Sequence, residues 1–210
     1  HEVWGLDDLI AREPLSAVEG TNGAVRYIEF VTDDSRLTLA NARTAADGGA
    51  LILTYAPARG FVTEAGSVVG VECESGVEGE CLGASIRGRV VVNASGPWVD
   101  AVRKLEDPAA PPRLSITKGI HLVVPRITDS GRILAFFDDH ERLFYVLPMG
   151  ERSVIGTTDT PVDDPSVAVT EEDKVFLLEQ INARLDLPRP LGHEDVIAER
   201  CGVRTLVVEP

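Results

Sequence analysis

A proline-rich segment divides the chain into two parts with different secondary-structure patterns. Residues 106–112 include Pro108, Pro111 and Pro112. Proline fixes its own φ and lacks a backbone N–H, so these residues exclude a regular helix or a central strand here. Helical and apolar patterns alternate before this segment, whereas strand patterns follow one another after it. The sequence therefore predicts two regions joined by a linker at 106–112.

The part after the linker is predicted to be mainly an antiparallel sheet. The predicted strands are 114–125, 133–137, 142–147 and 153–157. Turns rather than helices separate them, which is typical of antiparallel pairing. Thr170 and Asp173 form a capping-box pattern for a helix that continues to Leu185. The predicted apolar face of this helix consists of Val175, Leu178, Ile181 and Leu185.

The part before the linker mixes helices and strands. A short helix is predicted at 6–12, and a longer helix is predicted to begin at Asp33 or Asp34 and to end at Gly48–Gly49. The predicted strands are 25–31, 50–55, 58–63, 68–74 and 85–94. A turn at Ala65–Gly66 joins the two middle strands into a hairpin. Together the two parts predict an α/β fold class with α+β character.

Composition excludes several classes of function. A net charge of -14 argues against a nucleic-acid partner, but a few convergent cations can still bind a small anion. No run reaches the roughly 18 apolar residues of a membrane span, and the first residues do not resemble a signal peptide. Cys73, Cys81 and Cys201 are too few for a disulfide framework, and no bridge between the first two is expected. No spacing predicts a metal site, and we expect a cytoplasmic protein.

The run at 90–96 combines an apolar strand with a turn of small residues. Val90, Val91 and Val92 predict a buried parallel strand, and the run Asn93-Ala94-Ser95-Gly96 follows before a helix. A cofactor backbone can approach closely only where side chains are small, and a helix N-terminus favours phosphate. A tight turn without a ligand is an equally good interpretation of this motif alone.

A second motif, Lys118-Gly119-Ile120-His121, lies in the first predicted strand after the linker. Glycine inside a strand marks either a bulge or the close approach of another group. A regular strand would place Lys118 and His121 on opposite faces, whereas a bulge at Gly119 would place them on one face. Without a ligand, the simpler interpretation is a core histidine and a solvated lysine.

Two further motifs carry polar groups. The run 156–160, Gly-Thr-Thr-Asp-Thr, follows a strand and can order a loop through its hydroxyls and carboxylate, or form a plain turn. Arg204 follows Cys201-Gly202-Val203 among apolar residues. A guanidinium there is costly to bury without an anion and suits a phosphate or a carboxylate. An internal salt bridge is the alternative.

In order along the chain, these motifs resemble those of the FAD-dependent glycerol-3-phosphate dehydrogenases. The matching segments are 33–39, 91–98, 118–121, 156–159 and 202–204. The resemblance runs from about Tyr27 to Arg204, and it implies a flavin-dependent oxidation of sn-glycerol 3-phosphate to dihydroxyacetone phosphate. In that family the hydride passes to the flavin and the electrons pass on to an acceptor such as a quinone.

The resemblance also implies roles for individual residues. His121 would be the acid/base at the reacting hydroxyl, because its ordinary pKa lies near neutrality. Arg204 would bind the phosphate or the glycerol oxygens. Lys118 would support this anionic site, and Thr158 and Asp159 would order the loop on the substrate side.

Cofactor contacts and domains follow from the same resemblance. FAD would be approached by Ala58, Asn93, Ala94, Ser95 and Gly96. The expected domains are the N-terminal part of a substrate domain, the middle part of an FAD-binding domain and the substrate-binding domain, at 1–31, 32–107 and 108–210.

Parts of the family pattern are not found in this sequence. The Gly-rich dinucleotide fingerprint is expected upstream of His1 and the closing Gly-rich segment downstream of Pro210, while Thr205 replaces the usual proline. We therefore expect an internal piece of a longer enzyme that binds FAD weakly or not at all and has no turnover by itself. Peripheral contact with the inner face of a membrane, through segments outside the chain, is left open.

Three alternatives remain at this stage. The parent could be a related FAD-dependent oxidase of another hydroxy acid or of an amine. The chain could be a structural domain without chemistry of its own. A binding module without flavin would require the order of the motifs to be coincidental.

Overall fold

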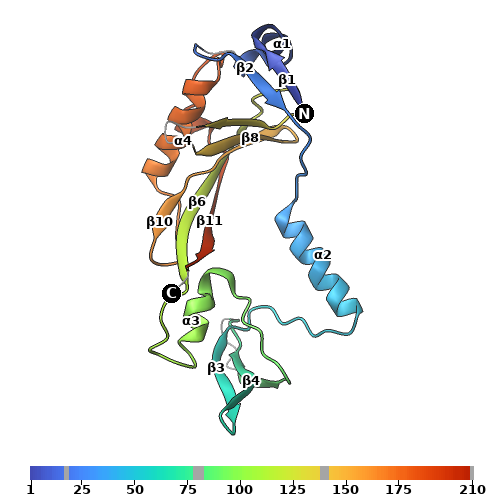
Figure 1. Ribbon diagram of the computed structural model, residues 1–210, viewed down its shortest axis with the longest axis vertical. Helices are drawn as coiled ribbons and strands as arrows, with labels where there is room; N and C mark the ends of the chain where they lie inside the picture. The colour runs from blue at the N-terminus through green and yellow to red at the C-terminus, as the bar shows by residue number, and fades with distance from the viewer. Residues whose placement is uncertain (17–18, 78–82, 138–141, 209–210) are drawn as a thin grey trace. The chain divides into compact units, whose positions relative to one another are not determined.

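The computed structural model describes residues 1–16, 19–77, 83–137 and 142–208. The chain divides into two compact units (Figure 1). Unit 1 combines His1–Ile28 with Leu114–Pro210, and unit 2 is Glu29–Arg113. Helices combine with antiparallel sheets, which confirms the predicted fold class. The function of each unit stays a prediction.

Unit 1 contains a sheet in the order β10-β6-β9-β8-β7, with β11 also paired to β6. Strands β9 and β10 pair with successive stretches of one edge of β6, and β11 pairs with its other edge. Every pair is antiparallel, as predicted for this part of the chain. Figure 1 shows β6 and β11 running side by side as long strands. The strands are β6 (Leu114–Pro125), β7 (Leu134–Phe137), β8 (Leu143–Met149), β9 (Arg152–Gly156), β10 (Thr160–Val162) and β11 (Ala198–Val207).

One face of this sheet forms the core with helix α4 (Glu171–Arg184). On β6 the core side chains are Ile120, Leu122 and Val124, all with 0% exposure. They belong to the same buried cluster as the α4 residues Leu177, Leu178, Ile181 and the C-cap Leu185. Alternate strand residues point to opposite faces, so Thr117, Gly119 and His121 lie on the other side of the sheet.

The predicted apolar face of α4 was wrong at one position. Val175 is 41% exposed, whereas Leu177 is 1% exposed. Leu177 lies one helical turn before Ile181 and therefore on the same face of the helix. The predicted capping box is confirmed, because Thr170 and Asp173 exchange the expected hydrogen bonds.

The N-terminal segment of unit 1 is tied to the part after the linker by an aromatic and ionic cluster. Strand β1 (Glu2–Gly5) pairs with β2 (Gly23–Arg26), and α1 (Leu6–Arg12) and the 3-10 turn η1 (Pro14–Ser16) follow β1 in the chain. Trp4 is buried beneath the guanidinium groups of Arg12 and Arg132, 4.8 and 5.5 Å from its ring centre. Arg132 also binds the buried carboxylate of Glu13 at 2.7 Å.

Unit 2 contains one long helix and a three-stranded sheet. Helix α2 (Asp34–Asp47) is capped by Asp33, whose carboxylate accepts from Arg36 N at 3.0 Å, and it ends at Gly48. The predicted hairpin is confirmed, with positive φ at Ala65 and Gly66 in its turn. The remaining elements are β3 (Ala58–Glu64), β4 (Ser67–Glu74), β5 (Gly83–Arg87), the 3-10 turn η2 (Gly96–Trp98) and α3 (Val99–Arg103).

Several predicted strands of the first part are absent or shorter in the structure. Residues 27–31, 50–55 and 88–94 form no strand. Leu51 and Val92 in these runs are 76% and 78% exposed. An apolar run becomes a strand only where a neighbour supplies backbone hydrogen bonds, and no strand among the described residues pairs with these runs.

Two sequence expectations concern cysteines and membranes. Cys73 and Cys201 are free thiols, and Cys81 lies outside the described residues. Among the helices of the described residues, none is long and apolar enough to cross a membrane.

A buried ion pair joins β6 to the start of α4. Lys118 and Asp173 are each 7% exposed, and the ammonium of Lys118 donates to the Asp173 carboxylate. Burial raises the pKa of Asp173, but the hydrogen bonds from Lys118 and Thr170 outweigh this effect and hold it below its usual value. The pair therefore fixes the first turn of the helix against the sheet.

We expect Lys118→Met to lower the free energy of unfolding by about 3–5 kcal/mol, because it leaves a buried carboxylate without its cation. Asp173→Asn should destabilise in the same way, and the double variant should lose less than the sum of the two. Urea unfolding measures all three. Lys174→Met is the control, since its ion pairs with Glu171 and Glu199 are less buried and should contribute at most about 1 kcal/mol. A Lys118→Met variant as stable as this control would contradict the assignment.

Candidate functional site

The face of the sheet opposite to the core brings together side chains from β6 and β11. Residues directly opposite each other in an antiparallel pair lie on the same face. The register pairs His121 with Arg200, Gly119 with Gly202 and Thr117 with Arg204. We call this surface the open face; it consists of Thr117, Gly119, His121, Arg200, Gly202 and Arg204.

Arg204 is held by the loop that joins β9 to β10. Its guanidinium donates to Asp159 Oδ1 at 2.9 Å, to Thr157 Oγ1 at 2.6 Å and to Thr158 O at 3.0 Å. These bonds require its side chain to pass over Gly119 of β6. A Cβ on Gly119 would collide with the guanidinium. The glycine therefore allows a close approach within the protein itself.

The internal salt bridge considered for Arg204 is thus present in the structure, with Asp159 as its partner. Arginine carries five N–H donors, and this loop uses only part of them. The fixed guanidinium can still bind an anion on its exposed side, because 44% of its side chain is accessible.

The other two loop residues have different roles. Thr158 is 5% exposed, and its hydroxyl accepts from Ile120 N at 3.1 Å. This hydrogen bond fixes the β9–β10 loop to strand β6. Thr157, which the sequence analysis did not select, contacts Arg204 directly. The sequence contained one indication of this role. Neighbours in an extended segment point to opposite sides, so if the hydroxyl of Thr158 faces the strand, that of Thr157 faces away from it.

His121 is partly buried and lies over Gly156 of β9. A Cβ on Gly156 would collide with the imidazole ring, so this glycine makes room for the histidine. Burial lowers the pKa of His121, and the nearby guanidinium groups of Arg204 and Arg200 lower it further. The imidazole is therefore neutral at neutral pH, and one ring nitrogen can accept a proton.

Lys118 does not join this face. The register of β6 with β11 is continuous, without the bulge considered at Gly119. Lys118 therefore points to the opposite side, where it pairs with Asp173. The simpler interpretation was also wrong, because the lysine is in the core and the histidine is on the open face. The geometry gives Lys118 a structural role in the core, on the side of β6 opposite to the open face.

The residues predicted to approach FAD lie in unit 2. Asn93 Oδ1 accepts from the hydroxyl of Ser95 at 2.7 Å, and its amide donates to Val99 O at 3.0 Å. This network holds a turn in which Ala94 and Gly96 are exposed. A Cβ on Gly96 would meet no heavy atom within 4 Å. The turn therefore offers an open, small-residue surface, which fits the close approach of a cofactor.

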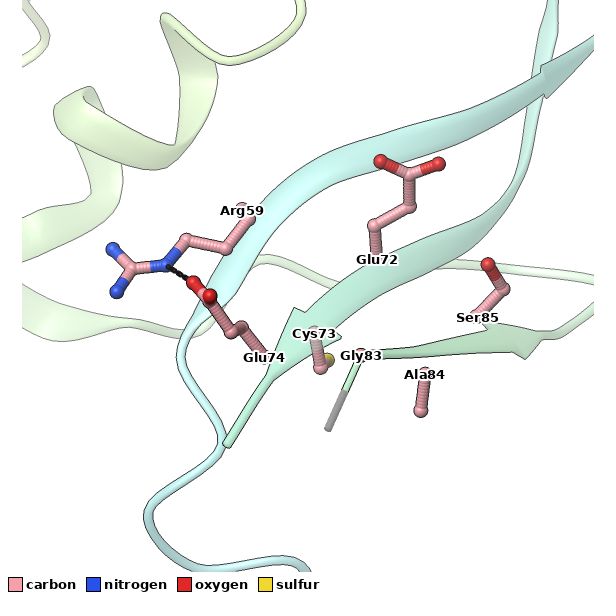
Figure 2. Close-up of a pocket in the computed structure, with 7 residues that line it drawn as sticks. All are labelled: Arg59, Glu72, Cys73, Glu74, Gly83, Ala84 and Ser85. Carbon is pink, nitrogen blue, oxygen red and sulfur yellow. Dashed lines mark hydrogen bonds and ion pairs between the residues drawn. The ribbon is translucent and has the colours of Figure 1, made fainter. Parts of the chain in front are cut away.

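Ala58, the remaining predicted cofactor residue, is the first residue of β3 and is half-buried. A hollow of about 350 Å³ lies beside this strand on the three-stranded sheet (Figure 2). The ion pair between Arg59 and Glu74, 3.0 Å long, borders it. None of the predicted site residues lines this hollow, and we assign it no function.

Comparison with known proteins gives a consistent family. The whole chain, residues 1–210, matches the family model described as FAD dependent oxidoreductase. An aerobic glycerol-3-phosphate dehydrogenase of Staphylococcus haemolyticus is 33% identical over 203 residues, which cover 94% of this chain and 36% of that protein. The chain thus spans little more than a third of the length of this curated relative.

Solved structures agree. The glycerol-3-phosphate dehydrogenase from Bacillus halodurans, complexed with FAD, is 31% identical with a TM-score of 0.90, over 98% of this chain and 42% of that one. Glycine oxidase from Bacillus cereus shares the fold, with a TM-score of 0.71 at 24% identity over 98% of this chain and 52% of that one. The chain belongs to the family of FAD-dependent oxidoreductases.

Proposed function

We propose that this chain is part of an FAD-dependent dehydrogenase that oxidises sn-glycerol 3-phosphate to dihydroxyacetone phosphate. The observation that carries the proposal is the open face, where a neutral His121 lies beside the fixed guanidinium of Arg204. The names of the relatives support the same substrate. Because those relatives are much longer than this chain, the activity is proposed for the whole protein.

The two units divide the work in this proposal. Unit 2 supplies part of the FAD site through the turn at 93–96 and through Ala58. Unit 1 supplies the substrate face. The predicted domain ranges and the individual cofactor contacts remain predictions.

The residues of the open face suit the chemistry of a secondary alcohol. His121 accepts the proton of the C2 hydroxyl at a ring nitrogen, which favours departure of the C2 hydrogen as a hydride. The chemistry that bound FAD would supply is that of a two-electron acceptor for this hydride. Arg204 binds the phosphate or a substrate oxygen with the N–H groups that Asp159, Thr157 and Thr158 leave available.

The final electron acceptor and the site in the cell belong to the same proposal. A quinone acceptor and peripheral contact with the inner face of a membrane are the expectations for the whole protein. They follow from the family resemblance, and the residues of the open face bear on neither.

Anaerobic mixing of the whole, flavin-loaded protein with sn-glycerol 3-phosphate should bleach the flavin absorbance. His121→Gln should slow this reduction about 10²–10⁴-fold, because the proton acceptor is lost. Arg43→Gln, an exposed change on α2, is the control and should react as the wild type does. Bleaching by lactate or glycine, with none by glycerol 3-phosphate, would refute the proposed substrate.

The rate should fall as the pH is lowered through the pKa of His121, which lies below its ordinary value of 6.5. Protonation removes the base, so activity is present above this pKa and is lost below it. Arg204→Met should raise the pKa of His121, since a neighbouring positive charge is removed. Titration of the imidazole by NMR measures the pKa in the unsubstituted protein and in the variant, and the rate of flavin reduction at different pH values should follow it. A pKa above 6.5 in the unsubstituted protein would contradict this prediction.

The purified 210-residue chain should contain far less than one FAD per chain. The exposed apolar runs at 50–53 and 90–92 have no strand partner among the described residues, and the chain matches only part of its relatives. The visible absorbance spectrum measures the flavin content after purification. A stoichiometric yellow protein would show that the chain alone completes the site.

A further inference from the structure

Arg200 is a second arginine on the open face, and it was not among the predicted site residues. It lies directly opposite His121 in the β6–β11 pairing and four residues before Arg204 on the same strand. Residues four apart on a strand share a face and lie about 13 Å apart. Arg200 and Arg204 therefore flank the same stretch of sheet.

The two arginines differ in their charge partners. Arg204 pairs with Asp159. Arg200 contacts the thioether sulfur of Met149 at 3.4 Å, which is a weak acceptor. Within the described part of the chain, Arg200 has no carboxylate partner. The open face thus carries a positive charge that no carboxylate of the described residues pairs with, on a chain whose net charge is -14.

The same charge acts on His121. Both Arg204 and Arg200 lower the pKa of this histidine, so both guanidinium groups lie close enough for their charge to affect it. An anion bound between them would lie next to the proposed base. A local cluster of cations attracts a small anion even on an acidic protein.

There is also room for such an anion. Gly202 lies between the two arginines on β11 and faces Gly119 on β6. A Cβ on Gly202 would meet no heavy atom within 4 Å. The guanidinium of Arg204 lies over Gly119. Arg200 is exposed, and among the described residues its side chain has a weak contact with Met149.

We propose that Arg200 is a second guanidinium of the substrate site, and that it binds the phosphate group of the substrate together with Arg204, above Gly202. A phosphomonoester suits this pair, because its oxygens can accept hydrogen bonds from both guanidinium groups. The identity of the anion rests on the proposed function, whereas the presence of an anion site does not.

Binding of inorganic phosphate to the whole, flavin-loaded protein, measured by isothermal titration calorimetry, tests this site. Arg200→Gln should weaken phosphate binding by about 10-fold or more, as expected for a lost charge-assisted hydrogen bond. Arg200→Glu should weaken it further. In steady-state assays with glycerol 3-phosphate, Arg200→Gln should raise KM with little change in kcat, because Arg200 binds the substrate without exchanging a proton with it.

Arg43→Gln removes the same charge from the surface of unit 2 and should leave the phosphate affinity unchanged. The proposal is overturned if the unsubstituted protein does not bind phosphate at millimolar concentration. It is also overturned if either Arg200 variant, with its flavin retained, binds phosphate within twofold of the wild type.

The two proposals can fail separately. Arg200-dependent phosphate binding in a protein that glycerol 3-phosphate does not reduce would support the anion site and refute the dehydrogenase function. Reduction by glycerol 3-phosphate with an unchanged KM in Arg200→Gln would support the function and overturn the role of Arg200.

Discussion

Unit 1 depends on the two-sided character of strand β6. One side of the strand carries Ile120 and its neighbours into the core against α4. The other side carries His121 and Gly119 to the open face. Because β11 pairs along nearly the whole of β6, the same register that completes the sheet also places Arg200 and Arg204 beside the histidine. Packing and site geometry therefore come from one interaction.

Glycine has an unusual part in this arrangement. Gly119 lets the Arg204 side chain cross β6 and reach the β9–β10 loop, and Gly156 leaves space for the imidazole of His121. Each glycine removes a side chain where a functional side chain must pass. A larger residue at Gly119 would displace the guanidinium of Arg204, and one at Gly156 would displace the imidazole of His121.

The two arginines of the open face differ in how firmly the guanidinium is held and in whether its charge is paired. Asp159 and Thr157 fix Arg204 in place, but Asp159 neutralises its charge in doing so. Arg200 has the reverse properties, with an exposed guanidinium and no carboxylate among the described residues. In the proposed anion site, Arg204 supplies a donor of fixed direction and Arg200 supplies the electrostatic attraction, so the two properties come from different residues.

The sequence alone determined the local elements: the capping box at Thr170, the Asp33 cap and the hairpin at Ala65–Gly66. Each of these depends on neighbours within a few residues. The resemblance to the family motifs also singled out His121 and Arg204 as candidate site residues. The tertiary structure decided which side chains meet. It placed Lys118 in the core, brought Thr157 into contact with Arg204 and Arg200 to the open face, and left the apolar runs at 50–55 and 88–94 outside any strand. These outcomes depend on which distant strand supplies the pairing partner and in which register, and no local pattern specifies either.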